Sequence, residues 1–233
     1  MFRNLVNRYR RFRQQVVVQQ RRPYEYAVNR YYAHLIDPLF TKWAYDLNLT
    51  PNFVTVVACL TGILAGLSFG AQYWAAGAIL LQLHHYLDGA DGNLARLTGK
   101  MTTLGAKLDR LCDQLVRFAV FVGLAIGADV PLWAKLFLPL TIYIDLWVVH
   151  AFVLPYARNH PLKRSRWKQW FLDRGILPGF DIFTVFFVIS LAALTGWINQ
   201  AVYLIIVLKN LDWLYRVWEC LKTAAWNRRK ARA

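Results

Sequence analysis

The sequence predicts an all-α integral membrane protein with six transmembrane helices preceded by amphipathic juxtamembrane helices. Apolar residues make up 57% of the 233 residues and charged residues only 18%, against about 45–50% and about 25% in soluble domains. The mean hydropathy is +0.28, and the 10 Trp, 12 Tyr and 14 Phe are typical of proteins with aromatic side chains at the membrane–water interface. This composition excludes an ordinary soluble globule, and it excludes a disordered chain, which needs low hydrophobicity.

Residues 1–49 are predicted to form amphipathic helices on the membrane surface, ahead of a six-span domain over residues 50–233. The first 22 residues are rich in Arg and contain no acid, while Phe2, Leu5, Tyr9 and other apolar residues recur at helical spacing. Such a helix suits an anionic membrane surface. A solvated basic tail or a nucleic-acid-binding arm are the alternatives. The aromatic stripe favours the membrane, so we expect no nucleic-acid partner.

A second amphipathic stretch runs from Val28 to Trp43, with apolar residues at i, i+3, i+4, i+7 and onward, and Pro38 is expected to bend it. Thr50-Pro51 then gives a helix start, an N-cap residue followed by Pro at the first helical position. Six apolar stretches of roughly the 17–25 residues that a bilayer requires follow. We place them at about 52–70, 73–96, 105–128, 132–156, 180–197 and 201–218.

The connections between these spans alternate between joins without Lys or Arg and basic loops. The joins near 71–72, 129–131 and 198–200 contain no Lys or Arg, whereas 157–174 and the C-terminal tail are strongly basic. The positive-inside rule therefore places both termini and the loops 97–104 and 157–178 in the cytoplasm. A prokaryotic inner membrane suits this compact chain. Cys59, Cys112 and Cys220 show neither metal-ligand spacing nor a disulfide framework, so we interpret them as packing residues.

Four acids gather at the cytoplasmic ends of the second and third spans. Asp88 and Asp91 are three residues apart, and Asp109 and Asp113 four apart, so each pair shares one helix face. Charges inside spans are costly and are usually retained for function. Carboxylates that converge must be protonated, paired or metal-bound. Oxygen-only ligands suit a hard cation such as Mg²⁺ or Mn²⁺, and two ions would suit displacement at phosphorus.

The surrounding residues fit a phosphate-bearing ligand. Gly92 and Ala95 share the face of Asp88 and Asp91 and leave room for a nucleotide to approach. Arg96 can bind a phosphate through its planar guanidinium. Gly105 opens the next helix, whose first N–H groups attract anions.

The segment resembles the signature of the CDP-alcohol phosphotransferase family. The match is Asp88-Gly-Ala-Asp91-Gly92-Asn-Leu-Ala95-Arg96, eight residues, Gly105, three residues, Asp109, three residues and Asp113, with no departure in spacing. The resemblance implies an amphipathic N-terminal helix, six spans and a homodimer. It also implies transfer of a substituted phosphate from a CDP-alcohol to a second alcohol, with release of CMP.

The resemblance also implies roles for individual residues. Asp88 and Asp109 bridge two metal ions, Asp91 completes one site, and Asp113 binds the other ion and takes the proton of the acceptor hydroxyl. Gly92 and Arg96 contact the CDP moiety. Further donor contacts are implied at Thr102 and at Asn52 and Thr55, which match an Asn-x-x-Thr pattern opening the first span.

The leading hypothesis is an enzyme of phospholipid biosynthesis that uses CDP-diacylglycerol and a small polar alcohol such as an inositol phosphate, glycerol phosphate or serine. The main alternative reverses the roles, with a CDP-linked choline, ethanolamine or inositol as donor and a lipid or polyol as acceptor. Gln114 after Asp113 departs from the Arg that the inositol-phosphate-using branch usually has there, which favours the other acceptors over inositol phosphate. A divalent-cation transporter is an alternative of another class, and an anchored scaffold is a weaker one.

Several polar residues have two readings. Asp145, His150, Asp181 and Asp212 lie within or beside spans and could face the cavity or support packing. The basic loop 157–174 is expected to be a lipid-facing topology signal, and part of it could bind a phosphorylated acceptor.

Overall fold

A computed structural model describes residues 2–14 and 23–230, and all the regular secondary structure in these two stretches is helical. The α-helices are α1 (Phe2–Arg13), α2 (His34–Asp46), α3 (Pro51–Gly70), α4 (Trp74–Thr98), α5 (Thr103–Gly127), α6 (Leu132–Val148), α7 (Leu154–Asn159), α8 (Arg166–Leu172), α9 (Ile182–Thr195) and α10 (Ile198–Lys230). Two π-helical segments, η2 (Asn29–Ala33) and η3 (Val149–Val153), precede α2 and link α6 to α7.

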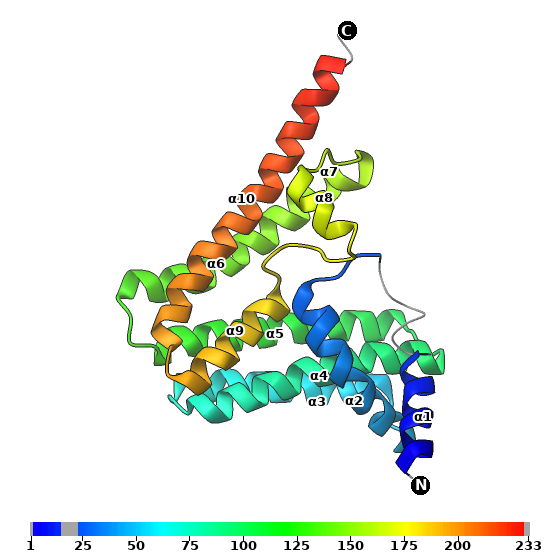
Figure 1. Cartoon of the computed structure of the whole chain (residues 1–233). Helices are drawn as coiled ribbons and strands as arrows, with labels where there is room; N and C mark the ends of the chain where they lie inside the picture. Colours follow the sequence, from blue (N-terminus) through cyan, green and yellow to red (C-terminus); the bar gives the residue numbers. More distant parts are fainter. Residues whose placement is uncertain (1, 15–22, 231–233) are drawn as a thin grey trace.

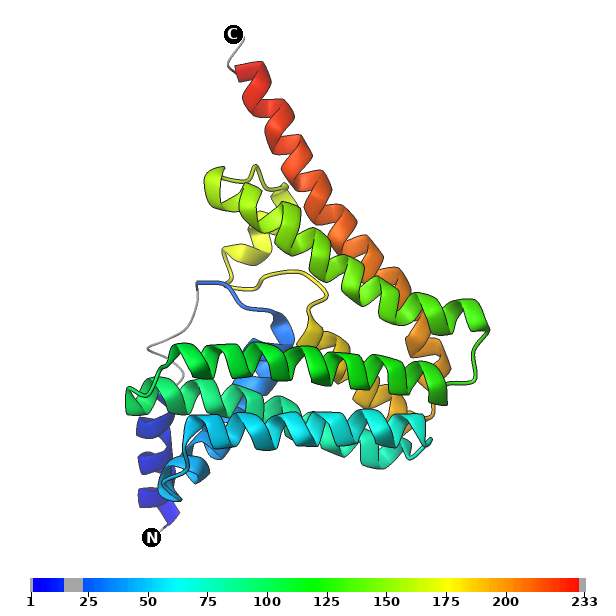
Figure 2. The ribbon, with the colours of Figure 1, turned by 180° about the vertical axis from the view of Figure 1, so that it is seen from behind.

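The helices form two groups (Figure 1). Helices α3, α4, α5 and α9 run side by side, with α3 packed against both α4 and α5 and with α2 and α9 against α4. Helices α6 and α10 pack on each other and run obliquely away from this layer, and the far end of α10 projects with the C-terminus (Figure 2). One apolar core connects the groups, with Phe69, Phe121 and Leu138 among its fully buried side chains.

Small residues allow α3 and α5 to pack closely. The sequence repeats Gly at four-residue spacing along α3, as expected for a close helix contact in a membrane. A Cβ atom on Gly66 would lie 2.4 Å from the backbone of Ala119, and one on Gly123 would lie 1.9 Å from the carbonyl oxygen of Gly66. Close contact therefore fixes the position of α5, which carries two of the four acids, relative to α3.

The predicted helix boundaries hold well in the first half of the chain and less well in the second. Thr50 caps α3 by accepting a hydrogen bond from Phe53 N, with Pro51 at the first position, as predicted. Helices α4 and α5 are each longer than predicted, so their connection is residues 99–102 rather than 97–104.

The last two predicted spans need correction. Helix α9 has only 14 residues and α10 has 33, because the helix of the final span continues through the charged tail to Lys230. Within the described residues, two helical stretches are long and apolar enough to cross a membrane, Pro51–Gly70 and Leu132–Asn159. The six-span count therefore stays a prediction.

The segment formed by η2 and α2 exposes large apolar side chains and buries polar ones. Helix α1 ends at Arg13, and residues 15–22 of the predicted first helix lie outside the described stretches. In η2 and α2, Tyr31 is 58% and Trp43 66% exposed, whereas Asp37 is 3% and Thr41 0% exposed. Helix α2 continues through Pro38. This orientation fits a helix whose outer face meets lipid.

The chain preceding α2 is anchored to the loop between α8 and α9. Glu25 N donates to Gly175 O at 3.2 Å, and Leu177 N donates to Glu25 O at 2.8 Å. Arg30 Nη1 also donates to Gly175 O, at 2.6 Å. The N-terminal segment and this distant loop are thus joined by three hydrogen bonds.

Candidate active site

Three of the four predicted acids converge where α4 and α5 meet. Carboxylate oxygens of Asp88, Asp91 and Asp109 all lie within 4.8 Å of one another. The turn between the helices produces this convergence, because Gly99 takes a left-handed conformation (φ 66°) and ends α4. Gly99 N and Lys100 N donate to the last free carbonyls of α4, a common helix-ending arrangement that lets the chain reverse at once.

The Asp91 carboxylate is held by the preceding helix. The hydroxyl of Thr55, on α3, lies 2.5 Å from Asp91 Oδ2 and 3.1 Å from the carbonyl oxygen of Pro51. Thr55 is 6% and Asp91 also 6% exposed, so this contact is sheltered from water. A hydroxyl carries one proton, and the shorter contact is the one to the carboxylate. Thr55, predicted as a donor contact, therefore fixes an acid of the cluster in place.

A cavity of about 240 Å³ opens beside the acids. Asp91 and Asp109 line it, together with all seven residues predicted to contact a CDP donor: Asn52, Thr55, Gly92, Ala95, Arg96, Thr102 and Gly105. The structure brings these seven together from α3, α4 and α5. Lys100 and Met101, from the short connection, also line the cavity and were not predicted as donor contacts.

This cavity suits an anion, because both its basic side chains and the N-terminus of α5 border it. Thr102 caps α5 by accepting a hydrogen bond from Gly105 N at 3.0 Å, so the first turn of α5 borders the cavity. Free N–H groups at a helix N-terminus and the adjacent positive charges of Arg96 and Lys100 attract phosphates. A Cβ atom on Gly105 would lie 2.9 Å from Asn52 Oδ1, so glycine at this position lets the Asn52 side chain lie close to the start of α5.

Asp113 is not among the three acids whose carboxylate oxygens lie within 4.8 Å of one another. One turn beyond Asp109 on α5, it lines a second cavity of about 690 Å³ between α5 and α6, with Arg110, Arg117 and His150. The fourth acid thus borders a space with several basic groups. Its predicted roles as metal ligand and as base stay predictions.

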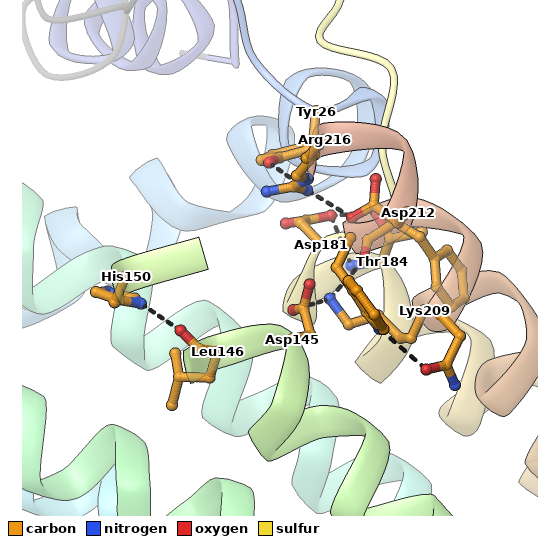
Figure 3. Close-up of polar contacts among 12 residues, drawn as sticks. Tyr26, Asp145, Leu146, His150, Asp181, Thr184, Lys209, Asp212 and Arg216 are labelled. Atoms are coloured by element: carbon orange, nitrogen blue, oxygen red, sulfur yellow. Dashed lines mark hydrogen bonds and ion pairs between the residues drawn. The ribbon is translucent and has the colours of Figure 1, made fainter. Parts of the chain in front are cut away.

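The remaining polar residues form a third group where α10 meets α6 and α9 (Figure 3). Lys209 Nζ lies 2.5 Å from Asp145 Oδ2, and Arg216 Nη2 donates to Asp212 Oδ2 at 2.6 Å. Asp181 caps α9 through Thr184.

His150 Nδ1, also drawn in Figure 3, donates to the carbonyl oxygen of Leu146 at 2.9 Å. Asp145, His150 and Asp181 line a cavity of about 150 Å³. Of the two roles that the sequence left open for these three residues, facing a cavity or supporting packing, the structure shows the first. Asp212 instead lines an apolar groove beside α8.

The acid cluster fits a divalent cation. Three carboxylates from two helices supply hard oxygen ligands at mutually compatible distances, and neither His nor Cys is among them. His84 is instead buried, with Nδ1 donating to Ala58 O at 3.0 Å. The site can therefore hold a divalent metal ion.

Comparisons with known proteins agree with this geometry. A sequence model described as CDP-alcohol phosphatidyltransferase matches residues 48–211. The chain is 29% identical over 181 residues to archaetidylinositol phosphate synthase of Pyrococcus horikoshii, covering 78% of this chain and 88% of that protein. It is 30% identical over 184 residues to a bifunctional IPC transferase and DIPP synthase of Aquifex aeolicus, covering 73% of this chain but only 39% of that longer protein.

The fold is similar to that of a solved phosphatidylinositol phosphate synthase. The Mycobacterium tuberculosis enzyme with CDP-DAG bound superposes with a TM-score of 0.59 at 19% identity, covering 79% of this chain and 93% of that chain. Its complex with manganese and citrate gives a TM-score of 0.56 at 19% identity, covering 80% and 89%.

These findings decide between the classes that the sequence left open. The family match spans most of the chain and includes the acid cluster and every residue predicted to contact the donor. An enzyme is therefore supported over a cation transporter or a scaffold. The chain belongs to the CDP-alcohol phosphatidyltransferase family and is a membrane-associated transferase of substituted phosphate groups in phospholipid biosynthesis.

Proposed function

We propose that the protein transfers the phosphatidyl group of CDP-diacylglycerol, or of a CDP-linked lipid of the same kind, to a hydroxyl of a small polar alcohol, with release of CMP. The observation that carries this proposal is the meeting of the three-acid cluster with a cavity lined by Gly92, Ala95 and Gly105. Small residues leave space for the nucleotide beside the acids. The names of the Pyrococcus and Mycobacterium relatives and the CDP-DAG bound to the latter support this donor.

The donor phosphates are proposed to lie between Arg96, Lys100 and the N-terminus of α5. Arg96 supplies a planar pair of donors for phosphate oxygens, and the first turn of α5 adds backbone N–H groups. Asn52 and Thr102 border the same space. Together these groups hold the negative charge of the pyrophosphate and orient the reacting phosphorus toward the acids.

Asp88, Asp91, Asp109 and Asp113 are proposed to hold Mg²⁺ or Mn²⁺, as two ions. When bound, such cations neutralise charge that develops on the phosphate oxygens during displacement. The chain contributes the ligands, with Asp91 fixed by Thr55. Asp113 is proposed to accept the proton of an acceptor hydroxyl, and its position in the wall of the second cavity, one turn beyond Asp109, supports this role.

The acceptor is proposed to enter the second cavity, between α5 and α6. Arg110, Arg117 and His150 line it beside Asp113. These basic groups favour an alcohol that also carries a negative charge, and an alcohol phosphate has that chemistry. Gln114 lines the same cavity. Its side chain is neutral, and a positively charged side chain at position 114 would favour a phosphate further.

The domain organisation is proposed to be surface helices over residues 1–49 and a six-span domain over 50–233, with both termini and the active site cytoplasmic. The exposed apolar residues of the long helices, such as Leu67, Phe118 and Leu136, support a lipid-facing surface. Lipid-facing aromatic and basic groups on α1 and α2 would hold the N-terminal helices on an anionic leaflet. A homodimer in the inner membrane completes the proposal.

Cysteine labelling tests this topology. The native cysteines are 7%, 8% and 1% exposed, so an introduced cysteine should dominate the signal. Arg164→Cys should react with an impermeant thiol reagent only in inverted vesicles, and Asp129→Cys only in right-side-out vesicles. Labelling of both from one side would contradict the six-span arrangement.

The reaction is tested by measuring CMP release from purified full-length protein. The protein is incubated with CDP-diacylglycerol, CDP-choline, CDP-ethanolamine or CDP-inositol, with Mg²⁺ or Mn²⁺, and with inositol phosphate, glycerol phosphate, serine or no acceptor. We expect acceptor-dependent CMP from CDP-diacylglycerol, abolished by EDTA. Release only from a CDP-linked small alcohol would refute the donor assignment, and the acceptor that gives product identifies the second substrate.

A further inference from the structure

Asn93 and Thr41 are buried polar residues that occupy neither a matched signature position nor the cavity wall. Asn93 on α4 is 8% exposed and Thr41 on α2 is 0% exposed. Burying an amide or a hydroxyl is costly unless its hydrogen bonds are made within the protein. The hydrogen-bond partners of these two side chains therefore indicate their role, and Arg96 is one of these partners.

The three side chains form one continuous hydrogen-bonded chain. Arg96 Nη2 donates to Asn93 Oδ1 at 2.8 Å, and Asn93 Nδ2 donates to Thr41 Oγ1 at 3.4 Å. Thr41 in turn donates its only proton to the carbonyl oxygen of Asp37 at 2.8 Å. Guanidinium can only donate, so the Asn93 oxygen must face Arg96 and its NH₂ must face Thr41. Asn93 and Thr41 therefore each accept from one neighbour and donate to the next, and Arg96 is the donor at the start of the chain.

This chain ends at a guanidinium in the wall of the nucleotide cavity. A Cβ atom on Gly92 would lie 3.4 Å from Arg96 Nη1 and 3.5 Å from Nη2, so the guanidinium lies over the preceding turn of its own helix. An Arg side chain has large rotamer entropy, which binding must remove unless the protein has already restricted it. Asn93 restricts it here, and Thr41 restricts Asn93.

We propose that Thr41 and Asn93 are positioning residues that hold the Arg96 guanidinium in the orientation that binds the donor, so that the juxtamembrane helix α2 is part of the donor site. This inference rests on the proposed function, in which Arg96 binds a donor phosphate. Helix α2 packs directly on α4, and its inward face carries Thr41 opposite Asn93. A shift of α2 on the membrane surface would therefore reach the nucleotide through two side chains.

The test uses Thr41→Val in purified full-length protein. We measure the Kd for CDP by calorimetry in the presence of Mn²⁺, the Kd for Mn²⁺ alone, and KM and kcat for CMP release. Loss of one positioning hydrogen bond should weaken CDP binding and raise the donor KM by about three- to tenfold, with kcat and Mn²⁺ affinity changed less than about twofold. Thr41→Ser, which keeps the hydroxyl, should retain the native values.

Thr223→Val is a matched control. Thr223 is also 0% exposed, donates to the carbonyl four residues earlier at 2.8 Å, and accepts a hydrogen bond from Lys163 N at 2.9 Å. It differs from Thr41 in lying on α10, away from Arg96. An equal loss of CDP affinity in Thr223→Val and Thr41→Val would overturn the proposal, because it would show a general cost of removing a buried hydroxyl.

A double-mutant comparison separates this inference from the proposed function. Asn93→Leu should weaken CDP binding in the native background but have no further effect in Arg96→Ala. If Arg96→Ala itself leaves CDP affinity unchanged, the donor role of Arg96 is wrong. If Arg96→Ala weakens CDP binding and neither Thr41→Val nor Asn93→Leu does, the donor role stands and only the positioning is overturned. Thr41→Val is nearly isosteric and carries the test alone if Asn93→Leu does not fold.

Discussion

Replacing Thr55 by Val should lower the affinity of the acid cluster for its metal rather than the affinity for the donor. Val keeps the shape of Thr and removes the hydroxyl that lies 2.5 Å from Asp91 Oδ2. Hydrogen bonds to charged groups contribute about 1.5–3 kcal/mol, and each 1.4 kcal/mol is about tenfold in an equilibrium constant. Groups that orient metal ligands typically contribute about 10–100-fold in metal affinity or activity. We expect half-maximal CMP release at about 10–100-fold higher Mn²⁺.

The assay is a Mn²⁺ titration of CMP release, together with direct Mn²⁺ binding followed by electron paramagnetic resonance. Thr61→Val, on the same helix, is the control, because its hydroxyl donates only to the Val57 carbonyl oxygen at 2.7 Å. Thr55→Ser keeps the hydroxyl and should keep the native metal dependence. A Thr55→Val protein with native Mn²⁺ affinity and a raised donor KM would refute this reasoning and favour the donor contact that the sequence predicts.

Three further outcomes are expected. Asp113→Asn should still bind CDP and metal but lose about 10²–10⁴-fold in turnover, the usual contribution of a positioned base, and full rescue by excess Mg²⁺ would refute that role. Gly123→Ala should destabilise by about 3 kcal/mol or more in an SDS-unfolding titration, the upper range for overpacking, because its Cβ would lie 1.9 Å from Gly66 O, whereas Gly70→Ala, at 3.6 Å from its nearest atom, should be tolerated. Burial opposes protonation of His34, but two neighbouring carboxylates raise its pKa above 6.5. The resulting stability is present below pH 6.5 and lost as pH rises through the raised value, so His34→Gln should lower Tm more at about pH 6 than at about pH 9, and a pH-independent difference would contradict it.

The local signals for the active site were predictable from sequence because they depend on short spacings. Asp88 and Asp91 share a face at three-residue spacing, and Gly99 permits the reversal that brings Asp109 to them. The Thr50-Pro51 start was equally local, since capping uses only residues within one turn. Gly92, Ala95, Arg96 and Gly105 follow from the same short spacings, whereas Asn52, Thr55 and Thr102 were implied by the resemblance to the family.

The features that the sequence did not predict depend on contacts between distant segments. The hydrogen bond from Thr55 to Asp91 spans 36 residues, and that from Asn93 to Thr41 spans 52. No periodicity specifies which polar partner a buried side chain finds in another helix. The C-terminal end of α10 was not predicted because hydropathy detects where an apolar segment ends, not where a helix ends. Charged residues such as Lys and Arg also favour the helical conformation, so the helix continues beyond its apolar part.

Helix α2 shows that the apolar face of an amphipathic helix in this chain points outward, as suits lipid, rather than inward, as suits water. In a soluble protein the stripe of Tyr31, Leu35 and Trp43 would turn inward, yet these side chains are more than half exposed. Against a membrane their exposure costs little, and the inward face is free to carry polar groups such as Asp37 and Thr41. Thr41 can remain buried because its hydroxyl donates to the carbonyl oxygen of Asp37 and accepts from Asn93 on α4. The orientation of α2 that exposes its apolar stripe thus also supplies the hydrogen bonds that reach Arg96 in the wall of the proposed donor cavity.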